Sequence, residues 1–288
     1  KAHSADELRS ILAGRTVSAS FGTGSDSFGG AYSTVPQDLE LQLQLLAAMV
    51  TAPGYRAEGE TQWRNQVGVI YPTLDSQPAA IIARDVTRLL ASGDTRFGLP
   101  REAEAKARNY EDLKPLIDAA LNRDAIEIGI VGDVDEAAAI AAVAKTFGAL
   151  PARAADRPDY GALRPIAFPA SRPPVTLTHS GKPNQAIALS YWPTTDGFDP
   201  KTEAQLTVLG HVLQLLMTDE LREKLGATYS PQAGSTTSSI YKGYGYLSAI
   251  SNVEPGNIPT VNAAVDAVAK RLVQKPIDAD LLLRARKP

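Results

Sequence analysis

An arginine and a tyrosine seven residues apart, Arg222 and Tyr229, have the residue types and spacing to do chemistry together. Arginine is a permanent cation with several N–H donors, and a neutral tyrosine offers one O–H donor. Such a pair suits the binding of a carbonyl oxygen or an oxyanion. Gly226 lies between them, where the end of a helix favours a left-handed residue. The chain reversal at this glycine can bring the two side chains near each other.

A long helix must position the arginine. Large apolar residues recur at spacings of three and four between residues 202 and 225 and form one stripe, made of Leu206, Leu209, Leu213, Leu216, Met217, Leu221 and Leu225. Arg222 then falls in the last turn, where a cation also suits the helix dipole, so a solvated helix end is the competing interpretation. Tyr229 follows in a strand-favouring stretch, where it could equally be a half-buried aromatic residue.

The ten residues 221–230 read Leu-Arg-Glu-Lys-Leu-Gly-Ala-Thr-Tyr-Ser. They resemble a signature of the M16 zinc metallopeptidases, the pitrilysin and insulinase group, and in particular of its bacterial PqqL-like members. The family's proteolytic unit has two homologous halves that close like a clamshell. The first half carries the zinc motif H-x-x-E-H. The metal-free second half lends an Arg and a Tyr to the substrate and to the tetrahedral intermediate. The resemblance assigns these two roles to Arg222 and Tyr229.

The chain itself offers no zinc motif. Its three histidines are His3, His179 and His211, none of them within H-x-x-E-H or H-E-x-x-H, and it contains no cysteine. The chain therefore resembles the metal-free half and is expected to be inactive alone. The resemblance implies two partners: a peptide substrate, and a zinc-bearing N-terminal half on the same polypeptide or on a partner subunit.

Composition excludes other classes of partner. The formal net charge is -3, and the two signs of charge are interspersed without long runs, so no nucleic-acid surface is expected. No apolar run approaches the roughly 18 residues of a membrane span, so we expect a soluble protein without a membrane partner. Residues 1–4 lead directly into a helical pattern and show no signal peptide. The resemblance favours the bacterial periplasm, and the cytoplasm stays open.

The predicted fold class is α+β, with two tandem M16-type (LuxS/metallohydrolase-like) domains. Each is expected to be an antiparallel or mixed sheet with helices on one face. We place the first domain at residues 1–157, a proline-rich linker at 158–174 and the second domain at 175–288. Helices are predicted over residues 4–13, 38–50, 62–70, 78–90, 110–121, 135–147, 202–225, 258–273 and from 279. Strands are predicted over 16–21, 28–34, 125–131, 175–178, 186–191, 228–233 and 244–251.

A short repeat supports the two-domain interpretation. Asp-Glu-Leu-Arg occurs at residues 6–9 and again at 219–222, and the same order of predicted elements follows each copy. The first copy begins inside its helix, so we expect the first domain to lack its opening strands. By the same pattern the second domain is cut at its C-terminus. Arg9 is followed by Val17 where the other copy has Tyr229, so Arg9 is interpreted as structural.

Other candidate motifs favour structure over chemistry. Gly22-Thr23-Gly24 lacks the Lys-Ser/Thr of a phosphate loop, and His179-Ser180-Gly181 reads as a turn. Tyr241, Tyr244 and Tyr246 are expected to pack within a hairpin. The alternative function is an M16-like scaffold or peptide-binding subunit with no role in catalysis. An unrelated α+β enzyme is a third possibility, for which the sequence shows no nucleophile, metal or cofactor motif.

The first prediction concerns metal. We expect the isolated chain to retain no stoichiometric zinc and to hydrolyse no peptide, because it lacks a ligand set. Metal analysis after dialysis and a fluorogenic peptide assay test this. One tightly held zinc per chain, or turnover that a chelator abolishes, contradicts it.

Overall fold

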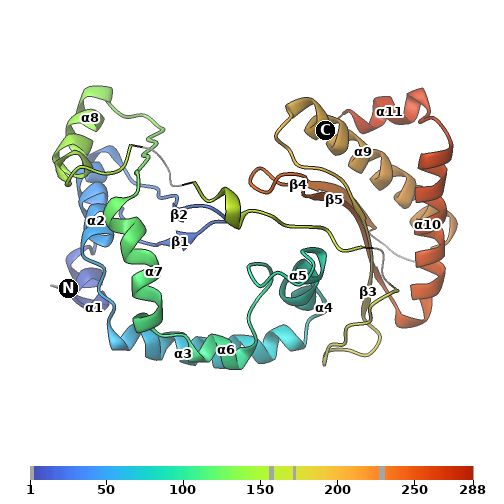
Figure 1. The fold of residues 1–288 in the computed structure, drawn as a ribbon, viewed down its shortest axis with the longest axis horizontal. Coiled ribbons are helices and arrows are strands. Elements are labelled where there is room, and N and C mark those ends of the chain that lie inside the picture. Colours follow the sequence, from blue (N-terminus) through green and yellow to red (C-terminus); the bar gives the residue numbers. More distant parts are fainter. Residues whose placement is uncertain (1–2, 156–158, 171–172, 227–230, 288) are drawn as a thin grey trace. The chain divides into compact units, whose positions relative to one another are not determined.

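The computed structural model describes residues 3–155, 159–170, 173–226 and 231–287. The chain forms two compact units, one of residues 1–65 and 106–159 and the other of residues 66–105 and 160–288 (Figure 1). The second unit thus takes one segment from the first half of the chain. The division into tandem domains 1–157 and 175–288 stays a prediction.

The first unit is mainly helical. Its elements are α1 (Ala5–Ile11), β1 (Gly22–Thr23), β2 (Phe28–Gly29), the 3-10 turn η1 (Pro36–Asp38), α2 (Leu39–Thr51), the first part of α3 (Ala57–Asp75), the end of α6 (Glu102–Ala107), α7 (Tyr110–Arg123), α8 (Glu136–Lys145) and the 3-10 turn η3 (Phe147–Ala149). The predicted capping box at Ser4 is confirmed, because Ser4 and Glu7 each accept the other's backbone N–H. A small core joins α2 to α8 through Leu39, Leu43, Ala139 and Ala142.

Two strand predictions for this unit are wrong in extent or in kind. The hairpin predicted over residues 16–34 has a ladder only at Gly22↔Gly29 and Thr23↔Phe28. Upstream of it the chain is held by side chains of α2 and its cap: Asp38 accepts the N–H of Thr16, and Gln42 bonds both backbone groups of Ser18. Polar side chains therefore replace a neighbouring strand.

The segment 125–131, predicted as a buried strand, forms no strand in the structure. Val131 is fully exposed, and Ile126 is 38% exposed. The apolar run has a strand's composition, but a strand exists only where a neighbour completes its hydrogen bonds. Within the described residues no ladder partner lies beside this segment.

The second unit contains a three-stranded antiparallel sheet in the order β3-β5-β4. The strands are β3 (Ala186–Pro193), β4 (Gln232–Thr237) and β5 (Gly245–Val253), with Ala186 opposite Val253 and Gln232 opposite Ile250. The helices are α4 (Pro78–Ile81), α5 (Thr87–Leu90), α9 (Pro200–Met217), α10 (Ile258–Gln274) and α11 (Ala279–Ala285), with π-helical turns η2 (Ile82–Val86) and η5 (Thr218–Lys224), short 3-10 turns η4 (Gly161–Leu163) and η6 (Pro255–Asn257), and the ends of α3 and α6. The predicted α+β class with antiparallel sheets is confirmed. Residues 175–178 are not a strand, because they lack ladder bonds.

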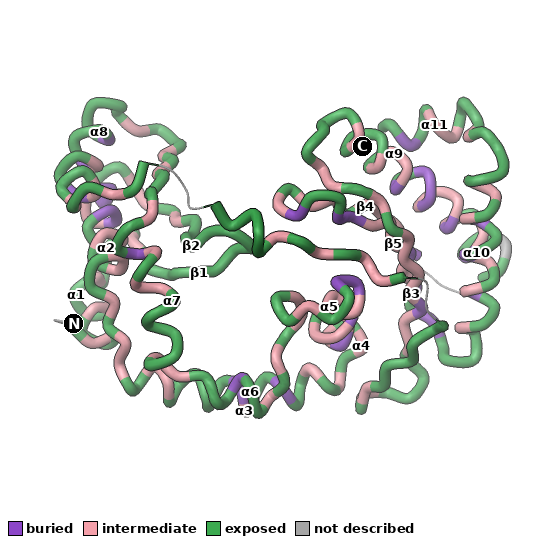
Figure 2. The backbone as a smooth tube through the Cα atoms, in the orientation of Figure 1, coloured by how far each residue is buried: buried purple, intermediate pink, exposed green. Residues whose placement is uncertain are grey.

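One face of this sheet carries the core. Ala188, Ala249 and Val253 point to the same side and meet the apolar stripes of α9 and α10. Leu213, Met217 and Leu221 of the first helix and its π-helical extension are at most 2% exposed, and Val261, Val265 and Val268 of α10 are buried as well. Figure 2 shows the buried positions gathered along α9, α10 and β5.

The opposite face carries aromatic rings. Tyr191 and Tyr246 meet edge to face at 5.5 Å, and Phe97 contacts Tyr241 and Tyr244 near the hairpin tip. Tyr241 and Tyr244 are each 7% exposed. The prediction that the hairpin tyrosines serve packing is confirmed, and Phe97 is the partner that sequence inspection missed.

Helix α9 covers the β4 edge of the sheet. At the β4 edge, Gln214 of α9 donates to Pro231 O at 2.8 Å and accepts the N–H of Ala233 at 2.6 Å. Its carboxamide therefore takes the place of a neighbouring strand. Gly210 brings α9 so close that an added Cβ would lie 2.9 Å from the backbone nitrogen of Ser235. Both contacts protect this edge from further pairing.

The order of elements after the Asp-Glu-Leu-Arg repeat agrees in both units. Each copy of the repeat is helical, the first within α1 and the second within η5, and a left-handed glycine follows, Gly14 at φ 78° and Gly226 at φ 57°. Two strands come next, then a 3-10 turn that begins with a proline, Pro36 or Pro255, then an amphipathic helix. This agreement supports the repeat, while the superposition of the two copies stays a prediction.

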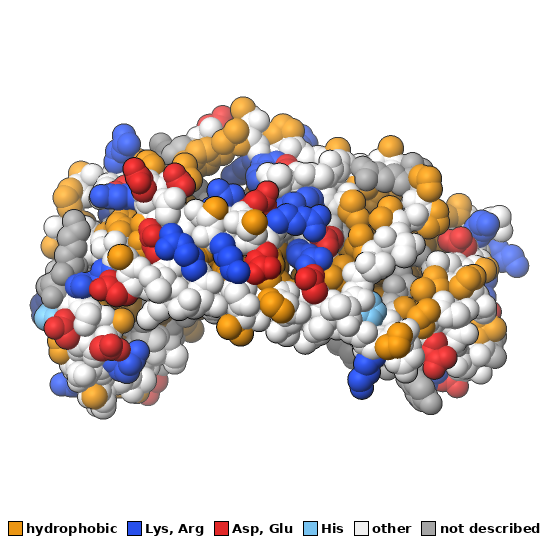
Figure 3. Space-filling view, turned by 90° about the horizontal axis from the view of Figure 1, so that it is seen from below, with side chains coloured by type: hydrophobic (Ala, Val, Ile, Leu, Met, Phe, Trp, Pro, Cys, Tyr) orange, Lys and Arg blue, Asp and Glu red, His pale blue; other side chains and the backbone are white. Residues whose placement is uncertain are grey.

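The surface charge is mixed. On the face shown in Figure 3, acidic and basic side chains lie next to each other. The described ion pairs include Arg64–Glu60 and Arg84–Asp85. In the described part of the chain no helix has both the length and the apolar character to cross a membrane.

The second prediction tests the β4 edge. We expect Gln214→Leu to lower the free energy of unfolding by about 1–3 kcal/mol, because it leaves the carbonyl of Pro231 and the N–H of Ala233 without their hydrogen-bond partner. Gln205→Leu, an exposed position on the same helix, is the matched control and should change stability little. Urea denaturation measures both, and equal stability of the two variants contradicts the role of Gln214.

The third prediction concerns alkaline pH. Burial, with neighbouring Tyr246, raises the pKa of Tyr191 and of Tyr244 to about 12. In the unfolded chain these phenols ionise near pH 10, so the unfolded state loses protons first. Their contribution to stability is complete below about pH 10 and is lost as the pH rises towards 12. A phenolate absorbance titration should show some tyrosines that ionise only near pH 12. This fraction should shrink in Tyr191→Phe and disappear in urea. If no tyrosine of the folded protein ionises this late, the assignment is contradicted.

Candidate functional site

The candidate site begins at the C-terminal end of α9. Asp199 caps this helix by accepting the backbone N–H groups of Lys201 and Thr202, and Pro200 occupies the first turn. Of the apolar stripe predicted from the sequence, Leu213, Met217 and Leu221 lie in the core of the sheet and Leu216 packs against it, whereas Leu225 is 46% exposed. The helix axis is therefore fixed by the core at the point where Arg222 follows.

The last turn of this helix is π-helical. In η5 the N–H of Leu225 donates to Glu220 O, five residues back, at 3.2 Å. A π-helical turn inserts one residue and rotates the side chains that follow, and such turns are frequent at functional sites. Leu221 stays in the core, fully buried, while the next residue, Arg222, is 59% exposed. The side chain of Arg222 therefore reaches solvent next to a leucine that is fixed in the core.

The guanidinium of Arg222 has a weak local partner. Its Nε lies 3.4 Å from a carboxylate oxygen of Glu223, which is also largely exposed. Solvent-exposed ion pairs contribute little, so a ligand carbonyl or carboxylate can replace this contact at small cost. Arg9, the counterpart in the repeat, pairs with Asp6 at 2.9 Å on its own helix.

The left-handed conformation predicted for Gly226 is confirmed by its φ of 57°. Tyr229, the second predicted site residue, lies outside the described residues, which stop at 226 and resume at 231. The pairing of Arg222 with Tyr229 therefore stays a prediction.

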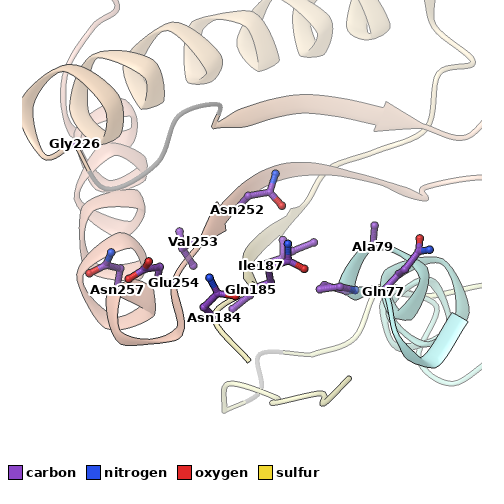
Figure 4. Close-up of a pocket in the computed structure, with 12 residues that line it drawn as sticks. Gln77, Ala79, Asn184, Gln185, Ile187, Gly226, Asn252, Val253, Glu254 and Asn257 are labelled. Carbon is purple, nitrogen blue, oxygen red and sulfur yellow. The ribbon is translucent and has the colours of Figure 1, made fainter. Parts of the chain in front are cut away.

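An open cleft of about 590 Å³ lies next to Gly226 (Figure 4). Gly226 lines one side, and the start of β3, the end of β5 and the start of α4 line the others. Most of the polar lining is carboxamide, contributed by Gln77, Asn184, Gln185, Asn252 and Asn257. Sequence reasoning missed this cleft, because its walls come from segments more than 100 residues apart.

The histidines have structural tasks. The Nδ1 of His211 donates to Ala285 O at 3.0 Å and ties α9 to α11. His179 closes its turn, because its Nδ1 accepts the N–H of Gly181 while its Nε2 donates to Gln185 O. Among the residues that the structure describes, no group of three or more His, Cys, Asp or Glu side chains could hold a metal ion.

Comparison with known families identifies the chain. The family model described as the peptidase M16 inactive domain matches residues 108–288, which is more than half of the sequence. The chain belongs to this family. No curated protein matches the sequence.

Solved structures share the fold. The periplasmic protease PqqL from Escherichia coli superposes with a TM-score of 0.73 at 18% identity, covering 97% of this chain and 31% of that one. A mutant of the ferredoxin protease FusC, in complex with Arabidopsis ferredoxin, gives 0.71 at 14% identity, with 99% and 31% covered. A peptidase M16 inactive domain from Pseudomonas fluorescens gives 0.64 at 20% identity, with 92% and 65% covered. The chain spans about a third of the length of the first two.

Proposed function

We propose that this chain is the metal-free half of a two-half zinc metalloendopeptidase. In the whole enzyme it would close over a peptide held at the zinc-bearing half, which lies on the same polypeptide or on a partner subunit. We assign the metal and the water it activates to that partner half, and the lack of a group of metal-binding side chains among the described residues is consistent with this assignment. The part played by this chain is to hold the substrate and to donate hydrogen bonds.

One observation carries the proposal. Arg222 emerges from a π-helical turn immediately after a fully buried leucine, seven residues before Tyr229, in a chain of the M16 inactive-domain family. The backbone that carries this cation is anchored in the core, and donors aimed at a carbonyl oxygen under attack stabilise the charge that develops on it. A single donor of this kind is typically worth about 2.7–4 kcal/mol in the transition state.

The similar structures support a polypeptide substrate and suggest a compartment. FusC is described as a ferredoxin protease and was solved with a ferredoxin, and PqqL is described as a periplasmic protease. By analogy we assign this chain a peptide substrate and a place in the bacterial periplasm.

The fourth prediction tests the two donors in the complete enzyme. We expect Arg222→Ala to lower kcat about 100-fold and to raise KM, because a charge and several donors are lost. Tyr229→Phe should lower kcat with little change in Tm, because one hydrogen bond made mainly in the transition state is removed. Steady-state kinetics on one peptide, with thermal melts, give the readout.

A matched control is available in the same unit. Arg284 is 58% exposed and paired on its own helix with Asp280, so Arg284→Ala removes a similar surface cation away from the site. It should leave kcat and KM unchanged. Wild-type kcat/KM in both Arg222→Ala and Tyr229→Phe would instead favour the scaffold or peptide-binding subunit.

A further inference from the structure

Gln214 and Thr218 share hydrogen bonds at the point where α9 changes its helical form. The regular helix ends at Met217, and Thr218 is the first residue of the π-helical turn η5. The hydroxyl of Thr218 donates to the backbone carbonyl of Gln214 at 2.9 Å and accepts from the Nε2 of the same residue at 3.1 Å. A hydroxyl bonded to the carbonyl four residues back often bends a helix, which suits a change of form at Thr218.

The carboxamide of Gln214 also holds the chain where it enters β4. Its Nε2 donates to Pro231 O at 2.8 Å, and its Oε1 accepts the N–H of Ala233 at 2.6 Å. If the amide were turned over, its oxygen would face the carbonyl of Pro231 and its NH2 would face the N–H of Ala233, so only one orientation fits. Both N–H donors and the oxygen of Gln214 are therefore engaged.

One carboxamide thus joins the beginning of η5 to the beginning of β4. Arg222 comes four residues after Thr218, and Tyr229 comes two residues before Pro231. In the sequence, both donors of the proposed function therefore lie between two points that Gln214 holds together.

The direction of Arg222 depends on the form of this turn. Without the inserted residue of the π-helical turn, the side chains that follow would be rotated by about 100°, the angle that one residue covers in an α-helix. Burial of Leu221 favours the observed form, but apolar contacts have little directional preference. Hydrogen bonds are directional, so the bonds of Gln214 and Thr218 define the turn more narrowly than burial does.

We propose that Gln214 and Thr218 are positioning residues for Arg222. Their shared hydrogen bonds fix the residue at which α9 becomes π-helical, and with it the direction in which the guanidinium leaves the helix. Both act through the backbone, without contact to the substrate. The inference rests on the proposed function and deepens it, because it names the side chains on which the aim of the donor depends.

The fifth prediction tests this in the complete enzyme with Thr218→Val, which keeps the shape of threonine and removes its hydroxyl. We expect kcat to fall about threefold to thirtyfold, because a displaced donor loses part of what its removal would lose. KM should stay within about twofold of wild type, since the charge of Arg222 is retained. Steady-state kinetics on one peptide, at a temperature well below the Tm of every variant, give the readout.

Two controls separate positioning from a general effect on the helix. Thr207 is exposed on the same helix and makes the same kind of bond, from its hydroxyl to Glu203 O at 3.0 Å. Thr207→Val should leave kcat within about twofold of wild type, as expected for a surface change. Thr218→Ser keeps the hydroxyl and should restore kcat to the same range. An equal loss in Thr207→Val, or no rescue by serine, overturns the inference.

A double-mutant cycle tests whether the effect passes through Arg222. In the Arg222→Ala background Thr218→Val should lower kcat by no more than about twofold further, because the aim of a donor has no effect once the donor is absent. A loss of the same factor in both backgrounds would show that the hydroxyl acts independently of Arg222, and the inference would be overturned.

Gln214→Glu provides a second route if Thr218→Val does not fold. This variant keeps an acceptor for the N–H of Ala233 and replaces the donor that faces Pro231 O with a carboxylate oxygen. It should lower kcat, and the loss should again disappear in the Arg222→Ala background. Unchanged kcat, or an undiminished loss without Arg222, contradicts the positioning role.

The same measurements distinguish this inference from the proposed function. If Arg222→Ala lowers kcat while Thr218→Val and Gln214→Glu leave it unchanged, the positioning role fails and the proposed function stands. If Arg222→Ala leaves kcat and KM at their wild-type values, both fail.

Discussion

The close packing of α9 beneath its sheet is the constraint on which the rest of the second unit depends. Gly210 lets the helix backbone approach β4, and Leu213 and Met217 then fill the space against β5 and α10. The π-helical turn keeps Leu221 in the same core and releases the next side chain to solvent. The position of Arg222 is thus set by apolar burial, worth about 1.5–3 kcal/mol for each large side chain, and needs no polar partner of its own.

The faces and edges of the sheet in the second unit have different neighbours. One face is filled by helices, and the other carries a tyrosine cluster closed by Phe97 and by Arg96, which lies over the ring of Tyr241. One edge is satisfied by the carboxamide of Gln214, while the edge at Ile187 keeps its backbone groups unpaired among the described residues.

The two units share an order of elements but differ at the positions of the proposed site. Both have a helical segment that contains Asp-Glu-Leu-Arg, a left-handed glycine and a 3-10 turn begun by proline. In the first unit Arg9 pairs with Asp6 on its own helix, and Val17 stands where the second unit has Tyr229. The shared elements therefore describe a scaffold, and the difference at two positions separates a structural copy from the one that carries the proposed site.

The sequence by itself determined the features set by local chemistry: the capping box at Ser4, the apolar stripe of α9, the left-handed Gly226 and the exposed Arg222 that follows the stripe. The tertiary structure alone decided the features that need a distant partner. Residues 125–131 have the composition of a buried strand yet form none, because a strand requires a neighbour to complete its hydrogen bonds. The carboxamide cleft combines segments far apart in the chain. Propensity and capping act within a few residues, whereas strand pairing and clefts are settled only when remote segments meet.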